Sequence, residues 1–152
     1  MILVCGHNEK LAAGLRRLAV ERGAPVFVEG FTKEVPRYMQ LADYFIGKPG
    51  PGSISEALQF HLPVIVECNG RTLPQERYNA QWVREKQVGI VVKSHREVAG
   101  AVAALLKPGE LEQFRARAAA MDNRAIFEIP LIFEKMLDET PEKVLAESES
   151  KI

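Results

Sequence analysis

The chain has 152 residues, enough for one domain with a hydrophobic core. Hydrophobic residues make up 47% and charged residues 26%, and the 20 basic residues balance the 20 acidic ones. This balance excludes a strong basic field for nucleic acid, and no apolar run reaches the ~18 residues of a membrane helix. Cys5 and Cys68 lack the spacing of zinc ligands, so we expect them to be reduced and expect no metal site. We also expect no signal peptide, and therefore a cytoplasmic protein.

Five short apolar runs predict strands, and they alternate with segments of helical periodicity. This alternation favours an α/β doubly wound fold with a parallel sheet. In such folds, ligands bind beyond the carboxyl ends of the strands. The predicted strands are Ile2–Val4, Val26–Val28, Tyr44–Ile46, Val64–Val66 and Gly89–Val92.

Helices are predicted in every connection. Asn8 caps the first, which Gly23 stops, and Pro36 is tolerated in the first turn of a short helix that runs to about Leu41. Ser94 and Glu97 have the spacing of a capping box. The remaining predictions are helices at about Gln75–Lys86 and Leu111–Met121, a helix that buries Val98, Val102, Leu105 and Leu106, and a last amphipathic segment from Ile126 to Leu137 that Pro130 kinks or restarts. We therefore expect a domain at residues 1–137 and a flexible acidic tail at residues 138–152.

The stretch Lys48–Glu56 has the pattern of a tight turn between a strand and a helix. Gly50 and Gly52 allow backbone angles that other residues avoid, and they let a ligand approach the main chain. Ser53 and Glu56 have capping-box spacing, and the free N–H groups of such a first turn attract phosphate. The alternative is a turn that needs glycine and binds nothing, and this stretch alone leaves both interpretations open.

The order of the motifs resembles the C-terminal, donor-binding half of GT-B glycosyltransferases of the family 28 type, in particular the monogalactosyldiacylglycerol synthases and diacylglycerol glucosyltransferases. The likeness covers about residues 2–106. It implies a single Rossmann-like GT-B C-terminal-type domain that binds a UDP-hexose. It also implies an inverting transfer of the hexose to a lipid-like or other hydroxyl acceptor. The motifs that carry it are Val4–Leu11, Gly30-Phe31, Ala42-Asp43, Lys48–Leu58, Leu62-Pro63, Pro74–Glu76 and Asn79.

The resemblance implies a role for most of these residues. Gly30 and Phe31 would meet the uracil, although Phe31 alone reads equally well as a core residue. The diphosphate would lie against Gly50, Pro51, Gly52 and Ser53, with Lys48 offsetting its charge. Glu56 would accept hydrogen bonds from the ribose hydroxyls, or would only close the capping box. Gln75 and Glu76 would bind the sugar hydroxyls, or are simply solvated first-turn residues, and Asn79 matches a family position whose task the sequence does not reveal.

The chain departs from the family pattern in two respects. The acceptor half, which supplies the catalytic base, is absent, so no catalytic residue is predicted here and the isolated chain is expected to be inactive. The first strand unit of the donor half is also missing. Its strand would lie between those at Ile2–Val4 and Tyr44–Ile46, so these two either pair directly or another chain fills the gap. His7 replaces an arginine of the family pattern, which puts a phosphate role there in doubt.

Two other functions remain open. The chain could be a non-catalytic donor-binding subunit that needs a separate acceptor-domain partner, or a protein like the sugar-nucleotide epimerases. The expected partners are a UDP-sugar as donor substrate with no further cofactor, an acceptor domain in cis or in trans, and a second copy through the incomplete sheet. The intact enzyme would associate with a membrane through the missing half.

Overall fold

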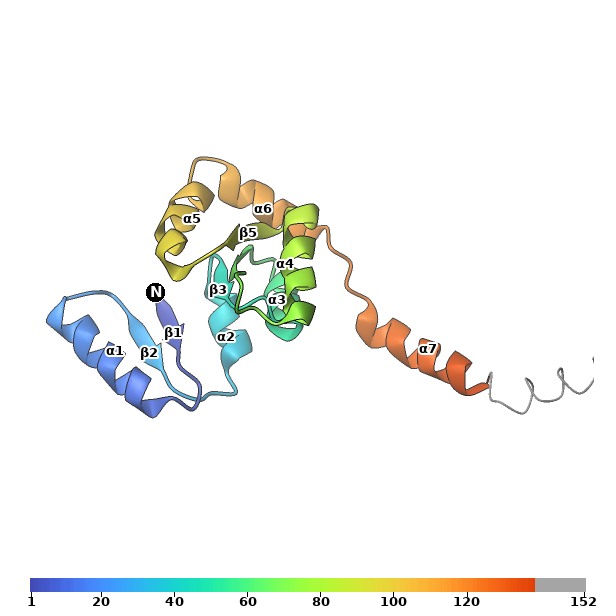
Figure 1. Cartoon of the computed structure of the whole chain (residues 1–152), viewed down its shortest axis with the longest axis horizontal. Helices are drawn as coiled ribbons and strands as arrows, with labels where there is room; N and C mark the ends of the chain where they lie inside the picture. The colour runs from blue at the N-terminus through green and yellow to red at the C-terminus, as the bar shows by residue number, and fades with distance from the viewer. Residues whose placement is uncertain (139–152) are drawn as a thin grey trace, which may run out of the picture. The chain divides into compact units, whose positions relative to one another are not determined.

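The computed structural model of the chain describes residues 1–138. It divides into two compact units, the first at Met1–Ala120 and the second beginning at Met121. The first unit holds the five strands and helices α1 to α6, and the second holds α7 (Ala125–Asp138) (Figure 1). The domain boundary expected at 137/138 stays a prediction, because the proposed tail at residues 138–152 lies outside the described residues except for Asp138, the last residue of α7.

The α/β class with parallel strands is confirmed, but the strands form two sheets and not one. In the first sheet β1 (Ile2–Val4) pairs with β2 (Phe27–Glu29). In the second, the order is β3 (Phe45–Gly47), β4 (Val64–Glu67), β5 (Gly89–Val92). Of the two alternatives for the first and third strands, direct pairing is wrong, because β1 and β3 lie in separate sheets; a strand from another chain between them stays a prediction. The first strand does not pair with the fifth either. Pairing needs backbones ~4.8 Å apart, and three-residue strands offer few ladder bonds to draw two sheets together.

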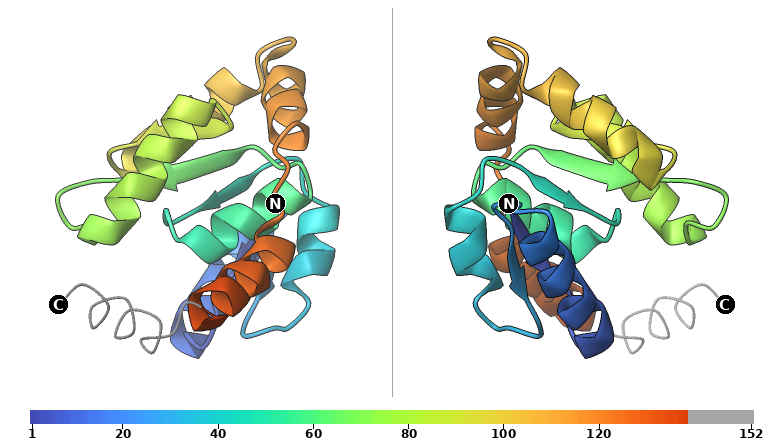
Figure 2. Two further views of the ribbon diagram at one scale, coloured as in Figure 1. Left: turned by 90° about the vertical axis from the view of Figure 1, so that its right-hand side faces the viewer. Right: turned by 90° about the vertical axis from the view of Figure 1, so that its left-hand side faces the viewer.

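The hydrophobic core is built around β4. Val64, Ile65 and Val66 are all fully buried, which shows that both faces of this central strand are covered. On one face Ile65 packs with Val92 of β5 and with Ala101 and Leu105 of α5 (Val98–Leu105). Helices α3 (Pro51–Gln59) and α4 (Pro74–Lys86) also pack against this sheet, and α6 (Glu110–Ala119) packs against α3 and α5 (Figure 2).

The helix ends show which local signals act. Asn8 caps α1 (Glu9–Glu21) as predicted, because its Oδ1 accepts a hydrogen bond from the Leu11 N–H at 3.0 Å. Helix α2 spans Val35–Gln40, with proline in its first turn. The predicted capping box at Ser94 is wrong: the Ser94 side chain makes no capping bond, and Glu97 accepts from the Lys93 N–H at 2.8 Å. A short 3-10 helix, η1 (His95–Glu97), intervenes there and changes the spacing.

One predicted core position is also wrong. Leu106 is 53% exposed, whereas its neighbour Leu105 is fully buried. The reason is that Leu106 is the C-cap residue of α5, where the chain leaves the helix and turns away from the core.

Helix α7 runs through Pro130 without being split into two helices. Its large apolar side chains are largely exposed within the described part of the chain, Phe127 and Phe133 among them. No helix among residues 1–138 is long and apolar enough to span a membrane.

Candidate functional site

The turn at Lys48–Gly50 joins the carboxyl end of β3 to α3. Gly50 is the N-cap residue, in extended conformation, and Pro51 occupies the first helical position. The prediction that Ser53 caps the helix is therefore wrong. Because proline has its φ already fixed near the helical value and lacks an N–H, it begins the helix two residues before Ser53. The Ser53 hydroxyl donates to the Gly50 carbonyl at 3.2 Å instead, and Glu56 lies beyond the capping-box position, exposed to solvent.

The first turn of α3 is open to a ligand. The Ile54 N–H is bonded to the Gly50 carbonyl at 3.1 Å, which leaves the N–H groups of Gly52 and Ser53 as the first-turn donors without a helical acceptor. Neither Gly50 nor Gly52 adopts a positive φ, contrary to the expected need for special backbone angles. A Cβ added to Gly52 would meet nothing within 4 Å, and one added to Gly50 would meet only the Ser53 Oγ at 3.4 Å. Here glycine keeps space clear beside the main chain.

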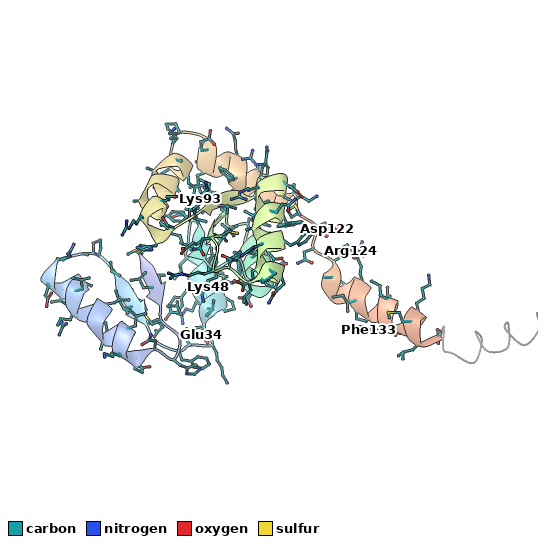
Figure 3. The ribbon with its side chains drawn as sticks, in the orientation of Figure 1. Glu34, Lys48, Lys93, Asp122, Arg124 and Phe133 are labelled. Atoms are coloured by element: carbon teal, nitrogen blue, oxygen red, sulfur yellow. The ribbon has the colours of Figure 1, made fainter. Side chains whose placement is uncertain are left out.

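Asn79 has a task that the sequence did not reveal. Its Nδ2 donates a hydrogen bond of 2.8 Å to the carbonyl of Pro49, which lies 30 residues earlier in the chain. Pro49 is buried, and Asn79 projects from the second turn of α4. The bond ties the turn before α3 to α4, so the two loops beyond β3 and β4 keep a fixed spacing. Lys48, labelled in Figure 3, extends from this turn and is exposed.

The loop between β4 and α4 is braced by residues that the sequence analysis missed. Asn69 donates from Nδ2 to Glu67 Oε1 at 2.7 Å, and its Oδ1 accepts from the Arg71 N–H at 2.8 Å. Arg77 reaches back from α4 to the carbonyls of Thr72 and Gly70, at 3.1 and 3.0 Å. An Asn two residues before a polar turn residue is a recognisable Asx-turn signal, whereas the bonds from Arg77 depend on the tertiary fold.

This bracing holds the start of α4 in place. Gln75 and Glu76 lie in its first turn, the first exposed and the second half-buried. The predicted residues of this sheet thus lie in the turn that follows β3 and in the first two turns of the helices that follow β3 and β4: Lys48, Gly50, Pro51, Gly52, Ser53, Glu56, Gln75, Glu76 and Asn79.

Gly30 and Phe31 follow β2 and belong to the other sheet. Gly30 is buried, and Phe31 is 56% exposed, so the interpretation of Phe31 as a core residue is wrong. Its ring stacks on His7, with centroids 4.0 Å apart and planes inclined by 14°. No hydrogen bond found among residues 1–138 joins this loop directly to the turn at Lys48–Gly50.

The carboxylate of Glu29 closes the base of the Gly30–Phe31 loop. Its Oε1 accepts from the Gly30 N–H at 3.0 Å and its Oε2 from the Tyr38 hydroxyl at 2.8 Å. The Tyr38 bond, followed by the Gly30 bond, lowers the pKa of Glu29 below its usual 4.5, and the same contact raises the pKa of Tyr38. The expected uracil loop is therefore anchored by a contact between β2 and α2 that sequence reasoning did not foresee.

A separate hollow of about 610 Å³ lies at the amino-terminal side of β3 and β4. Its lining includes Met39, Phe60, His61 and Arg115, all from segments that precede these strands or from α6. None of the predicted site residues lines it, so this hollow and the predicted donor site are distinct features.

These features define a parallel α/β domain whose open helix start and polar loops share one sheet edge, as in nucleotide-binding domains. The sequence model of the glycosyltransferase family 28 C-terminal domain matches residues 1–136. The chain therefore belongs to this glycosyltransferase family and corresponds to its C-terminal domain.

Similar proteins include two glycolipid synthases. Monogalactosyldiacylglycerol synthase 2, chloroplastic, from Arabidopsis thaliana is 36% identical over 132 residues, which cover 85% of this chain and 27% of that protein. The processive diacylglycerol beta-glucosyltransferase of Bacillus subtilis strain 168 is 32% identical over 107 residues, or 70% of this chain and 27% of that protein. The chain thus spans about a quarter of the length of these relatives.

Among solved structures, the glycotransferase of kitacinnamycin aligns with a TM-score of 0.49 and 21% sequence identity. The alignment covers 62% of this chain and 26% of that one.

Proposed function

We propose that this domain binds a UDP-hexose for an inverting glycosyltransferase, which passes the hexose to a lipid-like or other hydroxyl acceptor. The observation that carries the proposal is the open first turn of α3, held against α4 by the bond from Asn79 to Pro49. The names of the two relatives, a monogalactosyldiacylglycerol synthase and a diacylglycerol beta-glucosyltransferase, support a glycolipid product.

In this proposal the diphosphate lies at the start of α3. The N–H groups of Gly52 and Ser53 and the Ser53 hydroxyl donate to its oxygens, and the positive end of the helix dipole adds to the attraction. Lys48, exposed beside them, offsets charge. Glu56 is one turn further along α3 and exposed, so its carboxylate is free to accept from the ribose hydroxyls. Gln75 and Glu76 bind the hexose from the start of α4, and Gly30 and Phe31 bind the uracil.

The proposed reaction uses this domain to stabilise the leaving group. An acceptor hydroxyl oxygen attacks the anomeric carbon while a base in the acceptor domain removes its proton. The bond between the anomeric carbon and the UDP oxygen breaks, and the negative charge that develops on the diphosphate is met by the fixed donors of α3. The base is not among the proposed residues of this domain, so we expect the 152-residue chain alone to bind donor without turnover.

The partners remain part of the proposal. An acceptor domain, in the same polypeptide or as a separate chain, completes the enzyme. The enzyme associates with a membrane through that acceptor domain. A non-catalytic donor-binding subunit would use the same residues with the acceptor domain in trans. The edges of β1 and β3 away from β2 and β4 have no strand paired to them among residues 1–138, and they are where a second copy would add to the sheet.

Isothermal calorimetry of the 152-residue chain with UDP tests the proposal. Glu56→Gln should weaken UDP binding about ten- to a hundredfold, because a charge-assisted hydrogen bond to the ribose is lost. Glu112→Gln is the matched control, since Glu112 is an exposed glutamate in the first turn of α6, on a different helix. The proposal fails if the folded wild type does not bind UDP, and the role of Glu56 fails if both variants bind as the wild type does.

A further inference from the structure

The loop that joins β2 to α2 is closed at its base by one carboxylate. Glu29, the last residue of β2, contacts the first loop residue through Oε1 and helix α2 through Oε2, at 3.0 and 2.8 Å. Glu29 and Tyr38 are nine residues apart, so the contact bridges the whole loop. The ring of Tyr38 also lies against Phe27 of the same strand, with centroids 5.9 Å apart.

The rest of the loop is confined as well. A Cβ added to Gly30 would lie 3.0 Å from Oε1 of Glu9, the first residue of α1. The Phe31 ring stacks on His7, which belongs to the turn between β1 and α1. An exposed aromatic ring on a loop held at its base offers a flat apolar face to solvent in a fixed position.

The Gly30 N–H is already used by Glu29. Any base that reads main-chain groups here must therefore use groups beyond that N–H, next to Phe31. Their position depends on where the Gly30 backbone is held, and Glu29 holds it.

We propose that Glu29, together with Tyr38, is a positioning residue for the nucleobase: it holds the Gly30–Phe31 loop where Phe31 can stack on the uracil. This inference rests on the proposed UDP-sugar site and adds to it two residues that do not touch the ligand. Since Glu29 acts through the loop, its loss should weaken the binding of the uridine part of the ligand. The binding of the diphosphate at α3 should not change.

The test compares UDP with inorganic pyrophosphate, which lacks the uridine, by calorimetry on the 152-residue chain. Glu29→Ala and Tyr38→Phe should each weaken UDP about three- to tenfold, the range of one hydrogen bond. Pyrophosphate affinity should change by less than about twofold in both, because the donors at α3 are untouched. The double variant should bind UDP no more weakly than Glu29→Ala, since both changes remove the same contact.

Glu29→Gln supplies the rescue. Its amide oxygen can accept from the Gly30 N–H and its amide nitrogen can donate to the Tyr38 oxygen, so UDP affinity should stay near that of the wild type. Glu34→Ala is the control within the same loop. Glu34, labelled in Figure 3, precedes α2, and its side chain makes no capping hydrogen bond. Thermal unfolding shows whether each variant is folded at the assay temperature, and Tyr38→Phe, which keeps the ring, serves if Glu29→Ala does not fold.

The outcomes separate the two proposals. Wild type that binds UDP, with unchanged affinity in Glu29→Ala and Tyr38→Phe, overturns the positioning role and leaves the donor site standing. An equal loss of UDP and pyrophosphate affinity also overturns it, since that result indicates general damage. Wild type that binds pyrophosphate but not UDP removes the base site, and with it both the UDP proposal and this inference.

Discussion

The bond from Asn79 to the Pro49 carbonyl yields a quantitative prediction. In Asn79→Ala a carbonyl in a buried residue loses its partner, which costs about 1–3 kcal/mol. Alanine is the better helix former at this position in α4, which returns about 0.5 kcal/mol. We therefore expect Asn79→Ala to lower the free energy of unfolding by about 0.5–2.5 kcal/mol.

Asn79→Asp should be more damaging than Asn79→Ala. The new carboxylate would only accept hydrogen bonds, so it cannot donate to the Pro49 carbonyl and would be repelled by it. Aspartate also has no higher helix propensity than asparagine to offset this loss. The free energy of unfolding of Asn79→Asp should be lower than that of Asn79→Ala by a further ~0.5–1 kcal/mol. Gln81→Ala is the control, because Gln81 lies on the same helix but its hydrogen bond to Glu85 is exposed.

Urea unfolding at neutral pH, followed by circular dichroism, measures all three variants. The midpoint should fall in the order Gln81→Ala, Asn79→Ala, Asn79→Asp. The reasoning is refuted if Asn79→Ala is as stable as the wild type, or if Asn79→Asp equals or exceeds Asn79→Ala in stability. Either result would mean that the contact at 2.8 Å does not hold the turn to α4.

Three further predictions concern other positions. Ser53→Ala should change the free energy of unfolding by less than about 0.5 kcal/mol in urea, because Ser53 is not the cap; a loss of ~1 kcal/mol, typical of a cap, would contradict this. Gly89→Ala should cost about 3 kcal/mol or more, because its Cβ would overlap the backbone of Val64 in the adjacent strand; a wild-type urea midpoint would show that the strands separate easily. Because the pKa of Glu29 is lowered on folding, its carboxylate stabilises the fold at pH values above 4.5, its usual pKa. This contribution is lost as the pH falls through the pKa of the folded state. The difference in urea midpoint between wild type and Tyr38→Phe should therefore be constant near neutral pH and shrink below about pH 4.5; a difference independent of pH would exclude the carboxylate.

The sequence predicted those features that depend on neighbouring residues. Apolar runs located all five strands within one residue at their starts, and the Asn8 cap was confirmed. The prediction of a capping residue failed at α3, because Pro51 starts this helix two residues before Ser53. Strand partners were the larger failure, because pairing is decided between segments far apart in the chain.

The candidate site shows the same division. The residues at the start of α3 follow from a local strand–turn–helix pattern, and the resemblance to a family added the others. Asn79 bonds to a residue 30 positions away and Glu29 bonds across a loop, and neither partner is visible in the local sequence. Residues that support a site through contacts distant in the sequence are therefore identified only from the three-dimensional structure.

The division into two sheets has a consequence for how the chain unfolds. Among residues 1–138, the buried hydrophobic side chains that precede α2 are Ala12 and Val28, whereas β4 alone contributes three that are fully inaccessible. With so little apolar surface removed from water, the segment β1–α1–β2 should open as a unit of its own, at a lower free energy than the segment built around β4. Amide protons of the β1–β2 ladder should then exchange with solvent far sooner than those of the β4–β5 ladder. A nucleotide that binds at both sheet edges would slow that exchange, because its binding free energy adds to the stability of the closed segment.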